Sequence, residues 1–478
     1  MGNLIHTTQR AAVSKAVDVI LKKVNKDDRE KEIVKLVDLM EKYTKGYSEK
    51  IDYDRIRELV LDKDGFINHY INRVLDEVDP EVLKTVILNF GFEAMYNGTR
   101  TIRKMREVHQ CNIPWLILMD PTSACNLHCT GCWAAEYGNK LNLTLEEMDD
   151  LVQQGKELGV YFYMFTGGEP LVRKKDLISL CRKHKDCAFL AFTNGTLVDE
   201  EFCQQMKEVG NFALAISLEG YEEVNDSRRG GGVYKKVMHA MDLLKKNGLV
   251  FGTSICYTSK NCETVTSREF VKFMVDKGCK YAMYFHYMPV GNDASLELLP
   301  TPKQRSYLKE RVRQIRSIDH GEGLFTMDFQ NDGEFVGGCI AGGRNYFHIN
   351  ANGDAEPCVF IHYSGANIRT HSLLEILKQP LFMAYRDNQP FNENHLRPCP
   401  MLENPEILPK LVKETHAKST DLQSPESAEH LCEKCAKYAK DWTPCADKLW
   451  NEADKHHHSN YQNYKKDHEK AVYETQIS

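Results

Sequence analysis

The stretch Cys125-Asn126-Leu127-His128-Cys129-Thr130-Gly131-Cys132 places three thiols within eight residues. It follows the apolar run 115–119, which is typical of a β-strand and ends before Asp120 and Pro121. Thiolates at this spacing on one loop can turn toward one metal centre, most naturally an iron-sulfur cluster. Three cysteines leave one iron of a four-iron cluster without a protein ligand, and an open metal position is where a cofactor or substrate binds.

Two plainer interpretations of the triplet stay open on spacing alone. The thiols could simply be reduced, or they could form a zinc knuckle with a fourth ligand from elsewhere, for example His128, because CxxC elements are often zinc sites. A second motif lies one helix later. Thr166-Gly167-Gly168-Glu169-Pro170 follows the apolar run 161–165. Glycines let a backbone approach a ligand closely, and Glu169 can accept hydrogen bonds from an ammonium group.

In this order and context, the two motifs resemble those of the radical S-adenosylmethionine (SAM) enzymes, in which CxxxCxxC and GGEP end the first two strands of a partial (β/α)6 barrel. The resemblance implies that Cys125, Cys129 and Cys132 are catalytic ligands of a [4Fe-4S] cluster that chelates SAM. It also implies reductive cleavage of SAM to a 5'-deoxyadenosyl radical that abstracts hydrogen from a substrate, with an electron donor such as flavodoxin or ferredoxin. The residues assigned to cofactor binding are Gly167, Gly168, Glu169, Pro170, Asn194, Ser217, Glu219 and Arg229.

The composition narrows the function classes. The 478 residues carry a formal charge of -6, with a pI near 6.3, so we expect no nucleic-acid partner. Sixteen cysteines without a secretory leader predict a cytoplasmic protein with reduced thiols and metal ligation. No apolar run approaches the roughly twenty residues of a membrane span. A peripheral membrane contact stays open, because an interfacial helix needs no such run.

The patterns divide the chain into three predicted domains: helical at 1–112, a radical SAM partial barrel at 113–325, and a SPASM/twitch-like region with a polar tail at 326–478. The fold class is therefore α/β, a partial (β/α)6 TIM-like barrel between an N-terminal helical domain and a C-terminal auxiliary domain. We expect five or six N-terminal helices, which either brace the barrel or dock a substrate or partner. They lack the winged-helix pattern that many peptide-modifying relatives carry.

The ends of the third and fourth strands bear further candidates, because barrel strands present chemistry at their C-terminal ends. Asn194 lies in a TNG sequence that suits either a tight turn or a cofactor contact. By resemblance, Ser217 lies near the ribose and methionine of SAM, and Glu219 replaces the usual Asp, which leaves its carboxylate free to reach the cofactor or the substrate. Arg229 matches an arginine suited to the SAM carboxylate, with Arg228 as the register alternative.

Beyond residue 325 the cysteines return. Cys339, Gly353 and Cys358 fit the opening of SPASM and twitch extensions, which hold auxiliary iron-sulfur clusters, and a predicted hairpin with an Asn-Gly turn brings the two thiols together. Cys399 is a third candidate ligand of an auxiliary [4Fe-4S] cluster. The fourth ligand stays open between Cys432 and Cys435. Alternatively, Cys432, Cys435 and Cys445 hold a second cluster or a zinc ion, or the late CxxC only packs against the domain.

The substrate is not predicted by these motifs. It could be a peptide or protein side chain, a lipid or a small metabolite, and a non-catalytic iron-sulfur electron carrier or sensor is the alternative function. Seven cysteines are scattered singly, and most are expected to be buried packing residues. They are Cys111, Cys181, Cys187, Cys203, Cys256, Cys262 and Cys279. The histidines at 456–458 are expected in a solvated tail rather than in a metal site.

Overall fold

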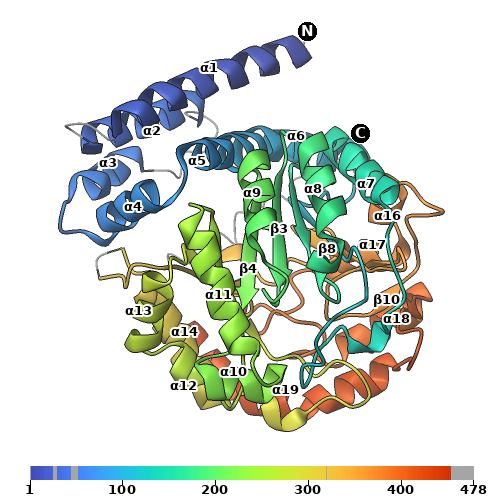
Figure 1. Ribbon diagram of the computed structural model, residues 1–478. Helices are drawn as coiled ribbons and strands as arrows, with labels where there is room; N and C mark the ends of the chain where they lie inside the picture. The colour runs from blue at the N-terminus through green and yellow to red at the C-terminus, as the bar shows by residue number, and fades with distance from the viewer. Residues whose placement is uncertain (1, 25–28, 45–51, 319, 454–478) are drawn as a thin grey trace.

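The computed structural model describes residues 2–24, 29–44, 52–318 and 320–453, so the histidines at 456–458 lie outside the described residues. The centre of the molecule is an open barrel (Figure 1). Within the described residues its sheet has the order β7-β6-β5-β4-β3-β2-β1-β8-β9. The strands are β1 (Leu116–Met119), β2 (Phe162–Phe165), β3 (Ala188–Thr193), β4 (Phe212–Ser217), β5 (Phe251–Tyr257), β6 (Tyr281–His286), β7 (Phe325–Asp328), β8 (Tyr346–Ile349) and β9 (Ala355–Glu356).

The first six strands are those that the sequence predicts, and neighbouring pairs run parallel. The described sheet is larger than the predicted six strands. β7 pairs parallel with β6, and β8 pairs parallel with β1, with Leu116 opposite Tyr346. The predicted hairpin between Cys339 and Cys358 is confirmed as β8 and β9, which pair antiparallel. Its first strand therefore also extends the barrel sheet.

Helices cover the outer face of the barrel, and α8, α9 and α11 lie over β3 and β4 in Figure 1. The helices between the strands are α7 (Leu145–Glu157), α8 (Lys174–Lys183), α9 (Glu200–Val209), α10 (Glu222–Arg229), α11 (Val233–Lys246), α12 (Cys262–Val265), α13 (Arg268–Asp276) and α14 (Pro302–Ile315). The capping box of Thr144 and Glu147 opens α7 as predicted. Strand side chains that face the helices form the main core, for example Phe189, Leu214 and Ile255.

The N-terminal part is helical, as predicted, and α1 to α4 lie outside the barrel beyond α5 (Figure 1). Its described elements are α1 (Gly2–Val24), α2 (Arg29–Thr44), α3 (Tyr53–Leu61), α4 (Phe66–Glu77), α5 (Pro80–Val86), the π-helix η1 (Ile87–Gly98) and α6 (Thr99–His109). Asp79 caps α5, and Pro80 follows it in the first turn. The buried Asn89 of η1 donates to the carbonyl of Cys187, just before β3, which ties this region to the barrel.

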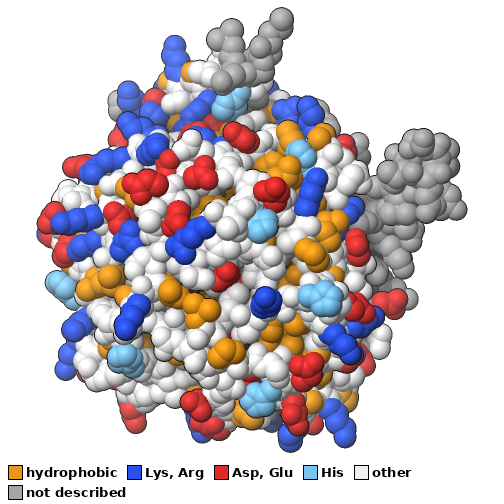
Figure 2. Space-filling model, turned by 90° about the vertical axis from the view of Figure 1, so that its right-hand side faces the viewer, with side chains coloured by type: hydrophobic (Ala, Val, Ile, Leu, Met, Phe, Trp, Pro, Cys, Tyr) orange, Lys and Arg blue, Asp and Glu red, His pale blue; other side chains and the backbone are white. Residues whose placement is uncertain are grey.

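The C-terminal part contacts the C-terminal end of a barrel strand, where His286 of β6 lies 2.6 Å from the Tyr438 hydroxyl. Its further elements are α15 (Gly333–Val336), β10 (Tyr363–Ser364), α16 (Leu373–Leu377), α17 (Pro380–Asn388), α18 (Ile407–Thr415), β11 (Lys418–Ser419) and α19 (Ala428–Glu452). α14 and α19 pack together through a fully buried pair, Arg305 stacked on Trp442 at 4.3 Å. Among the described helices, none is long and apolar enough to cross a membrane. Basic and acidic side chains are interspersed on the face shown in Figure 2.

Candidate functional site

The loop that carries the cysteine triplet and the GGEP segment form one unit at the C-terminal ends of β1 and β2. The amide of Gly168 donates to the Thr122 carbonyl at 3.0 Å, and the amide of Glu169 donates to the Ala124 carbonyl at 2.8 Å. A Cβ on Gly168 would lie 2.2 Å from that Ala124 carbonyl oxygen. The second glycine is therefore required by the loop itself, in addition to any ligand.

The Glu169 carboxylate is buried and has three internal donors. Oε1 accepts from the Leu171 amide at 2.9 Å and from the Thr193 hydroxyl at 2.7 Å, and Oε2 accepts from the Asn194 amide at 2.7 Å. Burial raises the pKa of Glu169, while these hydrogen bonds lower it. Glu169 thus joins the end of β2 to the end of β3, and an ammonium group would share this carboxylate with the three donors.

Asn194 reaches the cysteine loop from the end of β3. Its Nδ2 donates to Oδ1 of Asn126 at 2.8 Å, and Nδ2 of Asn126 donates to the Thr196 hydroxyl at 2.8 Å. Its Oδ1 accepts from the amide of Thr196 at 2.9 Å. Both polar atoms of the Asn194 side chain are therefore engaged in the turn and in the loop contact, as the turn interpretation predicts.

Glu219, just after β4, meets both candidate arginines. Its Oε1 accepts from Nη1 of Arg228 at 2.6 Å and from Nε of Arg229 at 3.0 Å. Nη1 of Arg229 lies 3.9 Å from the sulfur of Cys129. The Thr130 amide donates to the Arg228 carbonyl, and Nε of Arg228 donates to the Thr130 carbonyl. The side chain of Glu219 is 1% exposed, and its Oε2 has no hydrogen-bond partner among the described residues. Glu219 therefore holds the guanidinium groups of Arg228 and Arg229 beside the cysteine loop.

Cys256 is a functional candidate that the sequence reasoning did not identify. It lies near the end of β5 and is half-buried, whereas the other six scattered cysteines are buried as expected. Burial raises its pKa to about 11, and Arg228 opposes that effect. Cys132 also contributes to the raised pKa of Cys256, so the two thiols interact electrostatically. Ser217, half-buried at the end of β4, lies opposite Ser254 on the neighbouring strand.

The lumen beside these groups is lined by aromatic rings. Phe192 of β3 contacts Phe285 of β6 at 5.7 Å between ring centroids, and Phe285 contacts Phe329 at 5.3 Å. Phe329 in turn lies 5.8 Å from the ring of Tyr346 on β8. The three phenylalanines are half-buried, although they point into the barrel. They form an apolar wall that leads from the β3 end to the C-terminal region.

The C-terminal thiols of Cys339, Cys358 and Cys399 gather in one buried cluster. The sulfur of Cys399 accepts from the amides of Met401 and Leu402, both at 3.4 Å. Cys339 and Cys358 make the same kind of bond with the backbone of Ala341 and Phe360, as Cys125 does with the Leu127 amide at 3.5 Å. Sulfurs that accept several N–H groups suit an anionic, metal-bound thiolate.

Two buried tyrosines lie at the same thiols. The Tyr346 hydroxyl donates to the sulfur of Cys358 at 2.9 Å. The Tyr385 hydroxyl has no hydrogen-bond partner among the described residues, although Tyr385 interacts electrostatically with Cys339, Cys399 and Cys358. Orphaned donors are rare in protein interiors. The orphaned hydroxyl, together with the N–H groups on the sulfurs, fits a site for a cluster.

The three late cysteines lie along one helix, α19, so they do not form one metal site. Cys445 comes ten residues after Cys435, about 15 Å along a helix axis at 1.5 Å per residue. Cys445 contacts the Ser306 hydroxyl at 3.0 Å, and Cys435 donates to the carbonyl of Leu431 on its own helix. Cys432 packs in the same buried cluster as Cys358 and interacts with Tyr385. Cys435 lies in that cluster too, and Cys432 is the one of the two that interacts electrostatically with Tyr385.

A buried charge bridge joins the two thiol regions, and sequence reasoning missed it. Nε2 of His348 lies 2.9 Å from Oδ1 of Asp120, the residue after β1, and Nδ1 lies 2.7 Å from Oε2 of Glu356. Burial alone would lower the pKa of His348, but the two carboxylates raise it to about 10. Trp133, next to Cys132, stacks edge-on against His348 and Phe360. The sequence feature that could have pointed to this bridge is Asp120, a charged residue directly after the first barrel strand.

The described residues contain no group of three His, Cys, Asp or Glu side chains converging on a point that one metal ion could occupy. A [4Fe-4S] cluster is bound differently, because each thiolate binds a separate iron of the cube. His128 is exposed on the loop. Burial raises the pKa of Cys125 to about 11 and that of Cys358 to about 12, so both free thiols are protonated at neutral pH. A metal ion bound to either sulfur would displace that proton.

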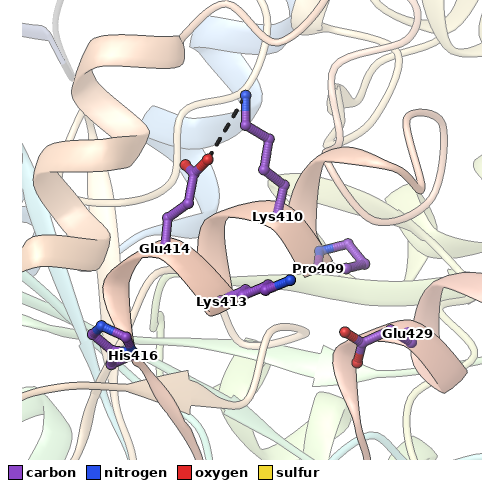
Figure 3. A pocket seen from close by; sticks show the side chains of 6 residues that line it. All are labelled: Pro409, Lys410, Lys413, Glu414, His416 and Glu429. Carbon is purple, nitrogen blue, oxygen red and sulfur yellow. Dashed lines mark ion pairs between the residues drawn. The ribbon is translucent and has the colours of Figure 1, made fainter.

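A surface pocket lies away from these thiols, beside α18 and the first turn of α19 (Figure 3). Its lining is mostly charged: Pro409, Lys410, Lys413, Glu414, His416 and Glu429. Lys410 and Glu414 form an exposed ion pair at 4.0 Å. None of these side chains is a thiol, and the pocket belongs to the outer surface of the C-terminal part rather than to the barrel mouth.

Two family models match the chain. Residues 119–261 match the Radical SAM superfamily, a range that contains the triplet, GGEP, Glu219 and Cys256. Residues 339–401 match the SPASM iron-sulfur cluster-binding domain, which contains Cys339, Cys358 and Cys399. The two matches fall on the two thiol regions that the structure describes.

Known proteins resemble the chain over much of its length. An AdoMet-dependent heme synthase of Methanosarcina barkeri is 25% identical over 303 residues, covering 58% of this chain and 86% of that protein. A PqqA peptide cyclase of Granulibacter bethesdensis is 26% identical over 312 residues, covering 62% and 81%. Among solved structures, Streptococcus suis SuiB bound to S-adenosylmethionine has a TM-score of 0.53 at 18% identity, covering 69% of this chain and 80% of SuiB. This last likeness concerns the fold.

Proposed function

Because this chain belongs to the radical SAM superfamily and carries a SPASM domain, we propose that Cys125, Cys129 and Cys132 hold its catalytic [4Fe-4S] cluster. The observation that carries this assignment is the joint unit of the cysteine loop and GGEP, in which the Glu169 amide bonds directly to the residue before Cys125. The family supports an enzyme rather than a non-catalytic electron carrier. The chemistry that a bound cluster supplies is one-electron reductive cleavage of SAM to methionine and the 5'-deoxyadenosyl radical, which abstracts hydrogen from a substrate.

The protein's own groups position the cofactor and keep water away from it. Gly167 and Gly168 offer backbone at the loop, and Glu169 fixes that backbone against β3. Arg229 sits between Glu219 and Cys129, where its guanidinium balances thiolate charge and offers a donor to the SAM carboxylate. Ser217 lies at the end of β4, toward the same mouth. The aromatic wall limits water around the reacting groups.

We propose one auxiliary [4Fe-4S] cluster on Cys339, Cys358 and Cys399, with Cys432 as the fourth ligand rather than Cys435. The late cysteines then form no second cluster, because α19 separates Cys445 from the others. Of the domain boundaries proposed from the sequence, 1–112, 113–325 and 326–478, the second falls inside β7. Because β8 pairs with β1, the barrel sheet also takes in a strand well past that boundary.

The substrate class is proposed only broadly, as a peptide or protein side chain, a lipid or a small metabolite. The PqqA peptide cyclase is named for a peptide and the heme synthase for heme, so the relatives do not choose between these classes. The aromatic wall of Phe192, Phe285 and Phe329 favours an uncharged reacting group. We further propose a cytoplasmic location and electron delivery by a flavodoxin or ferredoxin.

The test is anaerobic reconstitution with iron and sulfide, followed by incubation with SAM and dithionite. The expected result is 5'-deoxyadenosine, with about eight irons per chain, which is two cubane clusters. Absence of 5'-deoxyadenosine from protein that contains its full iron would overturn the proposed catalytic site. About four irons would overturn the auxiliary site, and about twelve would show a second auxiliary cluster.

A further inference from the structure

We infer that Tyr346 and Tyr385 are positioning residues of the auxiliary site, whose hydroxyls donate hydrogen bonds to its sulfur atoms and raise the reduction potential of the cluster bound there. The inference rests on the proposed auxiliary site at Cys339, Cys358 and Cys399. It concerns groups that are not ligands. The two tyrosines come from different elements, β8 and α17, and both are buried.

Tyr346 supplies a donor that is already in place. Its hydroxyl lies 2.9 Å from the sulfur of Cys358. The β8–β9 hairpin fixes this contact, because Tyr346 begins its first strand and Cys358 follows its second strand by two residues. The ring also packs on Phe329, the last ring of the aromatic wall, at 5.8 Å. Tyr346 therefore stands between the barrel lumen and the sulfur of Cys358.

Tyr385 supplies a donor that lacks an acceptor. The side chain is 0% exposed, and the hydroxyl has no partner among the described residues. The residue is held tightly, since a Cβ on Gly342 would lie 2.6 Å from the Tyr385 Cβ and the Phe391 ring lies 5.1 Å away. Burial raises its pKa well above the ordinary value, and the nearby thiols of Cys339, Cys399 and Cys358 add to that effect. A neutral hydroxyl fixed beside these thiols is suited to donate to cluster sulfur.

The hydrogen bonds of these thiols differ from those of two cysteines that only pack, Cys262 and Cys435. Buried Cys262 and Cys435 act as donors, to the carbonyls of Gln304 and Leu431. Cys399 instead accepts two amides, and Cys358 accepts the Tyr346 hydroxyl. Hydrogen bonds to the sulfurs stabilise the more negative, reduced cluster, and they are one of the means by which proteins set its potential.

The test compares the full-length reconstituted wild type with Tyr346→Phe and Tyr385→Phe. Each is titrated by potentiometric EPR, also in a Cys125→Ala/Cys129→Ala/Cys132→Ala background that isolates the auxiliary signal. Removal of one donor should lower the reduced-to-oxidised ratio about tenfold at a fixed potential, a shift of about 59 mV toward negative values for one electron. Tyr284→Phe is the matched control, because this buried hydroxyl donates to the Val265 carbonyl, away from the thiols, and should leave the potential unchanged.

A second measurement needs no variant. Pulsed ENDOR of the wild-type auxiliary cluster before and after transfer to D2O should reveal exchangeable protons on its sulfurs, and each Phe variant should lose one coupling. Unchanged potentials and couplings in both variants at full iron content would overturn the inference alone. Loss of about four irons in Tyr385→Phe would show that this hydroxyl is needed to retain the cluster, and would overturn its role as a donor that sets only the potential. If the wild type itself contains only about four irons, it is the proposed auxiliary site that fails.

Discussion

The two thiol regions are built in different ways. Cys125, Cys129 and Cys132 share one eight-residue loop, which backbone hydrogen bonds to GGEP hold in place. Cys339, Cys358 and Cys399 come from three segments separated by 18 and 40 residues, and buried side chains such as Glu403 and Tyr346 hold them together. The first site depends on local geometry and the second on tertiary packing. Changes in packing should therefore affect the second site more.

The largest expected effect is complete loss of SAM cleavage, and it distinguishes the two thiol regions. Cys129→Ala should abolish formation of 5'-deoxyadenosine and remove about four irons, while the auxiliary spectrum persists, because the ligand sets are separate. Cys358→Ala is the matched variant, with the barrel cluster retained and SAM still cleaved. Iron analysis, EPR and product chromatography measure these outcomes. SAM cleavage at the wild-type rate by Cys129→Ala would refute the ligand assignment.

The second prediction targets the packing of the auxiliary region. Glu403 accepts from Nη1 of Arg305 at 2.6 Å and from the Cys399 amide at 2.9 Å, and both charged side chains are fully buried. Glu403→Gln leaves Arg305 with an uncompensated buried charge, so it should destabilise the protein by about 3 to 5 kcal/mol. Auxiliary iron should be lost faster to a chelator than barrel iron.

The control for this prediction is Glu147→Gln, which removes a surface pair with Arg369 at 2.6 Å. An exposed pair contributes about 0 to 1 kcal/mol, so unfolding and iron retention should change little. Equal loss of iron from both clusters in Glu403→Gln would contradict the distinction between local and packed sites.

The third prediction concerns the bridge between the regions. The pKa of His348, raised to about 10 by its carboxylate neighbours, exceeds the value of about 6.5 in an unfolded chain. The resulting stabilisation is fully present below about pH 6.5 and is lost as the pH rises through about 10. Between pH 6.5 and 9 the loss should be about 2 to 3 kcal/mol. Thermal unfolding midpoints across this range measure it, and His348→Gln should show a flatter dependence. A wild-type midpoint that rises over this interval would contradict the protonated state of His348.

The strands that carry the cysteine loop and GGEP could be predicted from the sequence, because the motifs and their flanking apolar runs lie within one short segment. The fold class, the first six strands and the cap at Asp79 were likewise carried by periodicity and local motifs. The pairing of β8 with β1 could not be predicted, since no local pattern reports that a hairpin strand extends a sheet built more than 200 residues earlier.

The contacts that the sequence could not predict are long-range pairs of ordinary residues. In the buried bridge, Asp120 and His348 are 228 positions apart, and only His348 and Glu356 are close in sequence. Arg305 and Glu403 are 98 positions apart. Cys256 could not be distinguished from the packing cysteines, because nothing in a strand sequence tells which of its two alternating faces meets the lumen. The ion pairs of Glu219 with Arg228 and Arg229 could not be predicted either, because they depend on the conformation of the chain after β4.

The smallest expected effect tests whether Asn194 shapes a turn or contacts the cofactor. Asn126 is exposed on the cysteine loop, and its two hydrogen bonds to Asn194 and Thr196 link the loop to the β3 turn. Because solvent can replace such bonds, Asn126→Ala should destabilise the protein by only about 1 kcal/mol. Iron content should be unchanged, and the Kd for SAM, measured by calorimetry, should rise less than about tenfold, since a tenfold change corresponds to about 1.4 kcal/mol. Asn388→Ala, which removes one exposed bond to the Ala384 carbonyl on α17, is the control and should leave the Kd unchanged. A rise well above tenfold would mean that freeing Asn194 disrupts a direct contact with the cofactor, and the turn interpretation of Asn194 would then be wrong.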